Sequence, residues 1–151
     1  MWANGEMTVP PEDYASLKAF FGWMLTHVKP VPANLPAESH PMAVLDRIEA
    51  KSMANARKGL GMAIGDILEQ CARVAGDHLQ RIDTALAAYG LITLSAARAR
   101  FERKVRGIVK RGAVRNEGEY YALRNVVEAM AGEEQDRAWQ MLAAFEEKQA
   151  T

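Results

Sequence analysis

The sequence has few of the residues that mark disulfide-bonded, metal-binding or redox proteins. Its single cysteine, Cys71, excludes an internal disulfide and fits a reducing compartment. The three histidines are scattered at positions 27, 40 and 78, and no Glu-x-x-His motif of the di-iron bundles is present. We therefore expect no metal site and no cofactor. Because Cys71 lies among regularly spaced apolar residues, we interpret it as an inert buried thiol.

Strand patterns and long apolar runs are equally scarce. The chain has no alternating run of β-branched and aromatic residues and no Asn-Gly or Asp-Gly hairpin. Its most apolar stretch, 17–28, is too short to span a bilayer and contains Lys18 and His27. No basic segment at the N-terminus indicates a secretory signal. We expect a cytoplasmic protein with no membrane association, folded as one domain over residues 1–151.

Apolar residues recur instead at spacings of three and four, which predicts helices. The fold class is therefore predicted to be all-α, a single-domain bundle of about six helices. The expected helices span 11–28, 41–57, 61–89, 94–111, 116–130 and 133–148. The third, 61–89, would be a long central helix of roughly 43 Å. Four of the six prolines lie in 30–41, which predicts an extended strap.

A glycine-rich run at 59–65 superficially resembles a dinucleotide-binding loop. The spacing of Gly59, Gly61 and Gly65 does not match that motif, and no strand precedes it. We interpret the run as a helix break near Gly59 followed by close helix contacts at Gly61 and Gly65. Whether helices 41–57 and 61–89 continue through Gly59 and Gly61 stays open.

Charge is concentrated in one predicted helix, although the whole chain is neutral. Residues 98–115 hold eight Arg and Lys against one acid, and 116–151 carry a net charge of −5. At 100° per residue, helix 94–111 presents an apolar arc and an opposite basic face. That basic face comprises Arg100, Arg103, Lys104, Arg106, Lys110 and Arg111.

Three interpretations of this basic face remain open. The acidic segment that follows could neutralise it through Glu128, Glu133, Glu134 and Asp136. An acidic protein partner could bind it. Nucleic-acid phosphates are the third option, since arginine binds phosphate in a bidentate manner. A sequence-reading helix-turn-helix is disfavoured, because the helix after the turn begins with acidic residues.

Two sets of aromatic residues are candidate contacts. Phe20, Trp23 and His27 form a second row on helix 11–28, which either the strap or a partner must cover. Tyr121 is predicted to point to solvent beside the basic helix, whereas Trp139, Leu142 and Phe145 are predicted to point inward. The partner on either surface would be another protein or a second copy of the chain.

These observations favour a non-enzymatic protein-interaction or regulatory module. The alternative is a nucleic-acid-associated protein that binds phosphates through helix 94–111. An enzyme ranks third, and it requires a pocket that gathers His78, Asp77 or the Asp66 and Glu69 pair. We interpret the carboxylate pairs Asp46–Glu49 and Asp66–Glu69 as solvated faces.

Overall fold

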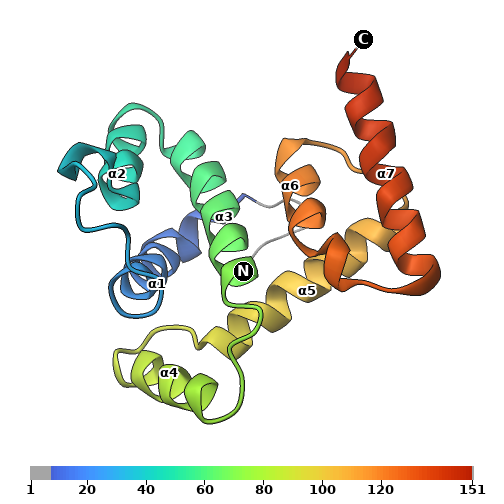
Figure 1. Cartoon of the computed structure of the whole chain (residues 1–151). Coiled ribbons are helices and arrows are strands. Elements are labelled where there is room, and N and C mark those ends of the chain that lie inside the picture. The colour runs from blue at the N-terminus through green and yellow to red at the C-terminus, as the bar shows by residue number, and fades with distance from the viewer. Residues whose placement is uncertain (1–7, 151) are drawn as a thin grey trace.

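The computed structural model describes residues 8–150, and in that range it contains helices and no strands (Figure 1). The all-α prediction is therefore confirmed. The expectation that no secretory signal occupies residues 1–7 lies outside the described part. The α-helices are α1 (Tyr14–His27), α2 (Pro41–Lys51), α3 (Met53–Gln70), α4 (Gly76–Ala88), α5 (Leu94–Arg111), α6 (Glu117–Val126) and α7 (Gly132–Ala150). No helix among these residues combines the length and the apolar content needed to cross a membrane.

The predicted long helix 61–89 is wrong, because the chain breaks between α3 and α4 over residues 71–75. Gly76 starts α4 at a φ of +58°, a conformation that glycine adopts more easily than other residues. Arg98 of α5 donates hydrogen bonds to the carbonyls of Cys71 and Val74 and so satisfies backbone groups that the break exposes. The regular apolar spacing persists across the break because both helices turn an apolar face to the core.

The boundary between α2 and α3 lies at Ser52, not near Gly59 as predicted. Ser52 is extended, with φ −158° and ψ 107°, and its side chain accepts a 3.1 Å hydrogen bond from the amide of Asn55. Serine is a favoured N-cap because its hydroxyl satisfies an amide of the first turn. The two helices are therefore separate, and α3 runs without interruption through Gly59 and Gly61.

The central element is α3, with α1 and α2 on one side and α5 and α6 on the other (Figure 1). Gly65 allows this close packing, since a Cβ atom there would lie 3.0 Å from the ring of Phe101. The predicted close contact is thus confirmed at Gly65, and Gly61 is buried. Asn125 of α6 donates a 2.9 Å hydrogen bond to Asp66 of α3, which ties the two halves together.

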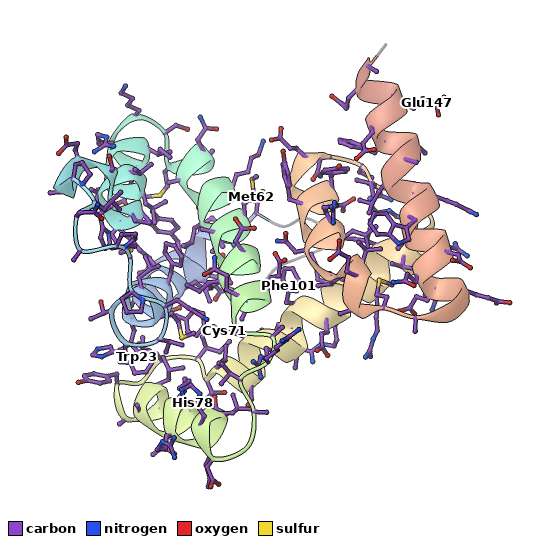
Figure 2. All side chains as sticks on the ribbon, in the orientation of Figure 1. Trp23, Met62, Cys71, His78, Phe101 and Glu147 are labelled. Atoms are coloured by element: carbon purple, nitrogen blue, oxygen red, sulfur yellow. The ribbon has the colours of Figure 1, made fainter. Side chains whose placement is uncertain are left out.

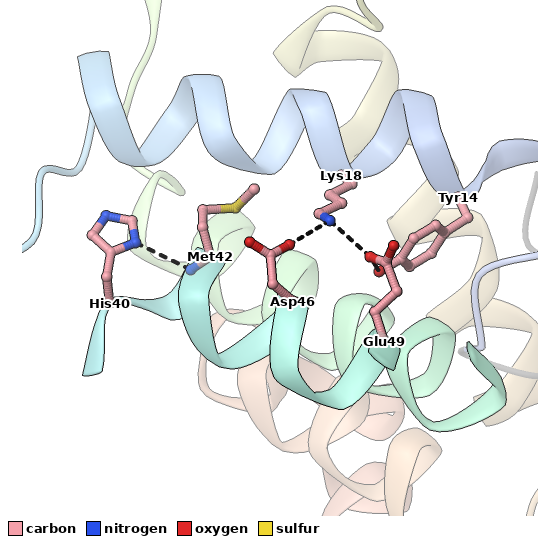
Figure 3. Close-up of polar contacts among 6 residues, drawn as sticks. All are labelled: Tyr14, Lys18, His40, Met42, Asp46 and Glu49. Carbon is pink, nitrogen blue, oxygen red and sulfur yellow. Dashed lines mark hydrogen bonds and ion pairs between the residues drawn. The ribbon is translucent and has the colours of Figure 1, made fainter. Parts of the chain in front are cut away.

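The proline-rich strap is less extended than predicted. Residues Ala37–Ser39 form one 3-10 turn, and His40 caps α2. The Nδ1 atom of His40 accepts a 3.1 Å hydrogen bond from the amide of Met42 (Figure 3). Pro41 occupies the first helical turn, where a missing amide costs nothing.

Candidate interaction surface

Helix α5 positions the charged residues of the candidate surface. The Thr93 side chain caps its start, accepting from the amide of Ala96, and Gly112 ends it at a φ of +89°. The apolar arc predicted for this helix is confirmed by burial of Leu94, Ala97, Phe101, Val105 and Ile108. The opposite side of α5 therefore faces away from the core, as the helical period requires.

The six predicted basic residues do not share one surface. Arg103, Arg106 and Lys110 are exposed and, at spacings of three and four, form a stripe that we call the outer stripe. Arg100 is half-buried. Lys104 and Arg111 turn toward the protein and are not part of the exposed basic face. Only 9% of Lys104 is exposed. Lysine tolerates such burial because its long aliphatic stem can pack along the edge of a helix.

Arg111 is held by Glu119, a carboxylate that is only 1% exposed. Glu119 accepts from the Arg111 guanidinium and, at 2.8 Å, from the amide of Arg115. Its own amide donates to the Asn116 side chain at 2.9 Å, so Asn116 is the N-cap of α6. The acidic segment therefore neutralises Arg111 directly.

The outer stripe is not neutralised in the same way. Arg103, Arg106 and Lys110 make no side-chain ion pair with any residue that the structure describes. The acidic residues predicted to pair with it do not do so. Glu128, for example, lies 3.6 Å from Arg124, four residues earlier in the chain. Direct pairing of the basic face with the acidic segment is thus confined to its inner edge.

An apolar groove of about 490 Å³ runs along the neighbouring side of α5. Its apolar lining comes from α3, the connection between α3 and α4, α5, α6 and the turn that follows α6: Leu68, Ala72, Phe101, Val105, Val109, Val126, Ala129 and Met130. Its polar lining comprises Glu69, Arg98, Glu102, Arg106, Asn125 and Glu134. A concave apolar site with a few convergent polar groups is typical of ligand and partner binding.

The groove carboxylates have no partners within the described structure. Glu69 of α3, Glu102 of α5 and Glu134 of α7 make no side-chain hydrogen bond or ion pair there. Arg106, on the same rim, is likewise unpaired. Arg98 differs, because its guanidinium binds the two carbonyls between α3 and α4. The groove therefore presents three unpaired negative groups and one unpaired positive group.

An aromatic cluster lies on α6 and α7. Tyr121 is 42% exposed, which agrees with its predicted orientation, and its ring meets Tyr120 edge-on at 5.2 Å. Trp139 is 40% exposed, so the prediction that it points inward is wrong. The Arg124 guanidinium lies 5.4 Å from the Trp139 ring centre, a cation–π geometry. Exposed Trp, Tyr and Arg are enriched at protein interfaces.

The second aromatic row on α1 is covered in part by the chain itself. Phe20 has no exposed surface and belongs to the core, so it cannot serve as the predicted partner contact without unfolding α1. Trp23 is half-buried, and its ring lies 4.7 Å from that of the exposed His27. Of the predicted row, His27 and part of Trp23 remain accessible.

Sequence reasoning missed a polar cluster between α1 and α2, which we call the latch (Figure 3). Lys18 lies 2.6 Å from Asp46 and 2.7 Å from Glu49, and the Tyr14 hydroxyl donates to Glu49 at 2.7 Å. Asp46 and Glu49 therefore pair with α1, which the prediction of a solvated face did not include, although the Asp46 side chain stays 63% exposed. The hint in the sequence was Lys18, a charged residue within the most apolar stretch, 17–28.

The latch holds its charges in place. Hydrogen bonds to Asp46 and Glu49 raise the pKa of Lys18, and burial together with the Glu49 hydrogen bond raises the pKa of Tyr14 to about 12. The Lys18 hydrogen bond lowers the pKa of Glu49. A nucleophilic or basic lysine needs a lowered pKa, so the latch is suited to joining helices and not to that chemistry.

The groups required for the enzymatic alternative are only partly brought together. His78 and Glu69 line a shallow depression of about 480 Å³ with Lys29 and Arg73, whereas Asp66 bonds Asn125. Cys71 is buried, and burial raises the pKa of its thiol, as expected for an inert cysteine (Figure 2). Among the described residues, no three His, Cys, Asp or Glu side chains are placed to hold a metal ion.

Comparison with known proteins finds no match: no protein-family model, no curated protein and no solved structure matches the chain.

Proposed function

We propose that this protein is a non-enzymatic binding module that holds a protein partner on the surface formed by α5, α6 and α7. The groove beside α5 carries the proposal, because it combines an apolar lining with unpaired charged groups on its rim. Both features favour an occupant that buries apolar side chains and pairs charges. The exposed Tyr121, Arg124 and Trp139 lie on the same half of the molecule and extend the contact area. We place this activity in the cytoplasm.

Photo-crosslinking tests the proposal. A photoreactive phenylalanine at Ala129, an exposed groove residue, is compared with the same residue at Ala50, which is exposed on α2 and outside the proposed surface. We expect one protein to crosslink from position 129 and not from 50. The purified partner should then bind with an affinity that Ala129→Trp lowers at least about tenfold, or 1.4 kcal/mol. Equal crosslinking from both positions, or unchanged affinity in Ala129→Trp, contradicts the proposal.

The outer stripe supports one competing function, binding to nucleic-acid phosphates. Its three cations are exposed and make no ion pair with a described residue. Salt titration of binding to random duplex and single-stranded DNA separates this function from protein binding. Phosphate binding predicts a steep loss of affinity with salt and loss of binding in Arg103→Gln/Lys110→Gln. If no binding appears even at low salt, the nucleic-acid function is wrong.

A further inference from the structure

The three groove carboxylates come from three different helices and converge on one apolar floor. Glu69 lies in the last turn of α3, Glu102 midway along α5, and Glu134 in the first turn of α7. From this arrangement we propose that the groove is a docking site for a basic amphipathic helix of the partner. The inference rests on the proposed function and specifies the chemistry of the partner.

The shape of the lining favours a helix as the occupant. Along α5 the lining extends from Arg98 to Val109, which is about three helical turns or ~17 Å. Helix-in-groove recognition places apolar side chains at spacings of three and four into such a trough. The α3 residue Leu68 and the α6 residue Val126 supply apolar walls from two other helices.

The charges of the rim favour a basic occupant. Glu69, Glu102 and Glu134 have no described partner, so lysine or arginine side chains at the edges of a bound helix would pair them. Arg98 also lines the groove, but its guanidinium donates to carbonyls at the end of α3. It therefore repels a basic helix less than an arginine without such bonds. Among the described residues, Arg106 is the one cation of the groove rim whose side chain makes no hydrogen bond or ion pair. Within the groove lining, a basic helix therefore meets three unpaired carboxylates and one unpaired cation, and Arg103 and Lys110 of the outer stripe do not line the groove.

Two synthetic peptides test the choice of charge. Both have ~four helical turns and the same leucine face, and they carry either lysine or glutamate at the flanking positions. Binding to the full-length protein is measured by fluorescence anisotropy at low and at physiological salt. We expect the lysine peptide to bind at least about tenfold more tightly at low salt, with a smaller difference as salt rises.

Charge variants of the rim give opposite expected changes. Glu102→Gln/Glu134→Gln should weaken the lysine peptide by about tenfold, whereas Arg106→Gln should strengthen it. Glu147→Gln is the matched control, because Glu147 lies toward the far end of α7, away from Phe101 (Figure 2). Ala129→Trp should block both peptides, with Ala50→Trp on α2 as its control; circular dichroism and melting confirm that each variant is folded.

Several results would overturn the inference. These are tighter binding of the glutamate peptide, no binding of either peptide, or an unchanged lysine affinity in Glu102→Gln/Glu134→Gln. Sedimentation that reveals a dimer abolished by Ala129→Trp would assign the groove to a second copy instead. If a partner still crosslinks from position 129 while the peptides fail, the proposed function stands and the basic-helix inference alone is wrong.

Discussion

The buried pair of Arg111 and Glu119 provides a sharp test of how the basic helix is joined to α6. In Glu119→Ala the Arg111 guanidinium, whose side chain is 22% exposed, loses its carboxylate. Removal of one partner of a buried pair costs about 3–5 kcal/mol. Because Arg111 keeps a 2.8 Å bond to the Ala113 carbonyl and some contact with water, we expect a smaller loss than this, about 2–3 kcal/mol. For a chain of this length that lowers Tm by roughly 5–10 °C.

Thermal and urea unfolding of matched variants measure this effect. Glu117→Ala removes an exposed carboxylate two residues earlier and should change stability by less than about 0.5 kcal/mol. Arg111→Met/Glu119→Leu leaves no charge unpaired and should recover part of the loss, since Arg111 Nε already lacks a partner. The reasoning is wrong if Glu119→Ala has the same Tm as the wild type, or if the double variant is less stable than Glu119→Ala.

Three further predictions concern the packing of the fold. Gly65→Ala places a Cβ 3.0 Å from an aromatic ring and should cost about 1–3 kcal/mol in urea unfolding, whereas Gly59→Ala has open space and should gain up to about 1 kcal/mol. Arg98→Met removes the bonds to two carbonyls, so it should cost about 2 kcal/mol and speed amide exchange over residues 71–75. The pKa of Glu49 is lower in the folded state than its ordinary value of 4.5. The latch therefore stabilises the folded state at pH values above 4.5, and this contribution is lost as the pH falls through the folded-state pKa. Glu49→Gln should flatten this part of the stability–pH curve relative to Asp46→Asn.

Local periodicity predicted the helices and the buried arc of α5 because each depends on neighbouring residues. It could not place residues at the edge of that arc. Lys104 and Arg111 lie near the boundary between core and solvent, and the position of Arg111 depends on a carboxylate in the next helix. Trp139 and Met141 illustrate the same limit in α7, where Met141 is buried and Trp139 is not.

Helix breaks were predictable where a local cap marks them. Ser52 is such a signal, because its hydroxyl can accept from the amide three residues later, whereas the nearby glycines do not interrupt α3. The break before Gly76 differs, since its exposed carbonyls are satisfied by Arg98 from a later helix. The groove is the extreme case, because residues such as Glu69, Glu102 and Glu134 meet only after α3, α5 and α7 have packed.

The central claim is that partner binding occurs on the groove side of α5. Hydrogen–deuterium exchange of the full chain, alone and saturated with the partner identified by crosslinking, tests it most directly. The account predicts slower amide exchange in α5 and over residues 125–134, with no change in α1 and α2. Protection centred on α1 and α2, or no protection in α5 at saturation, would contradict it.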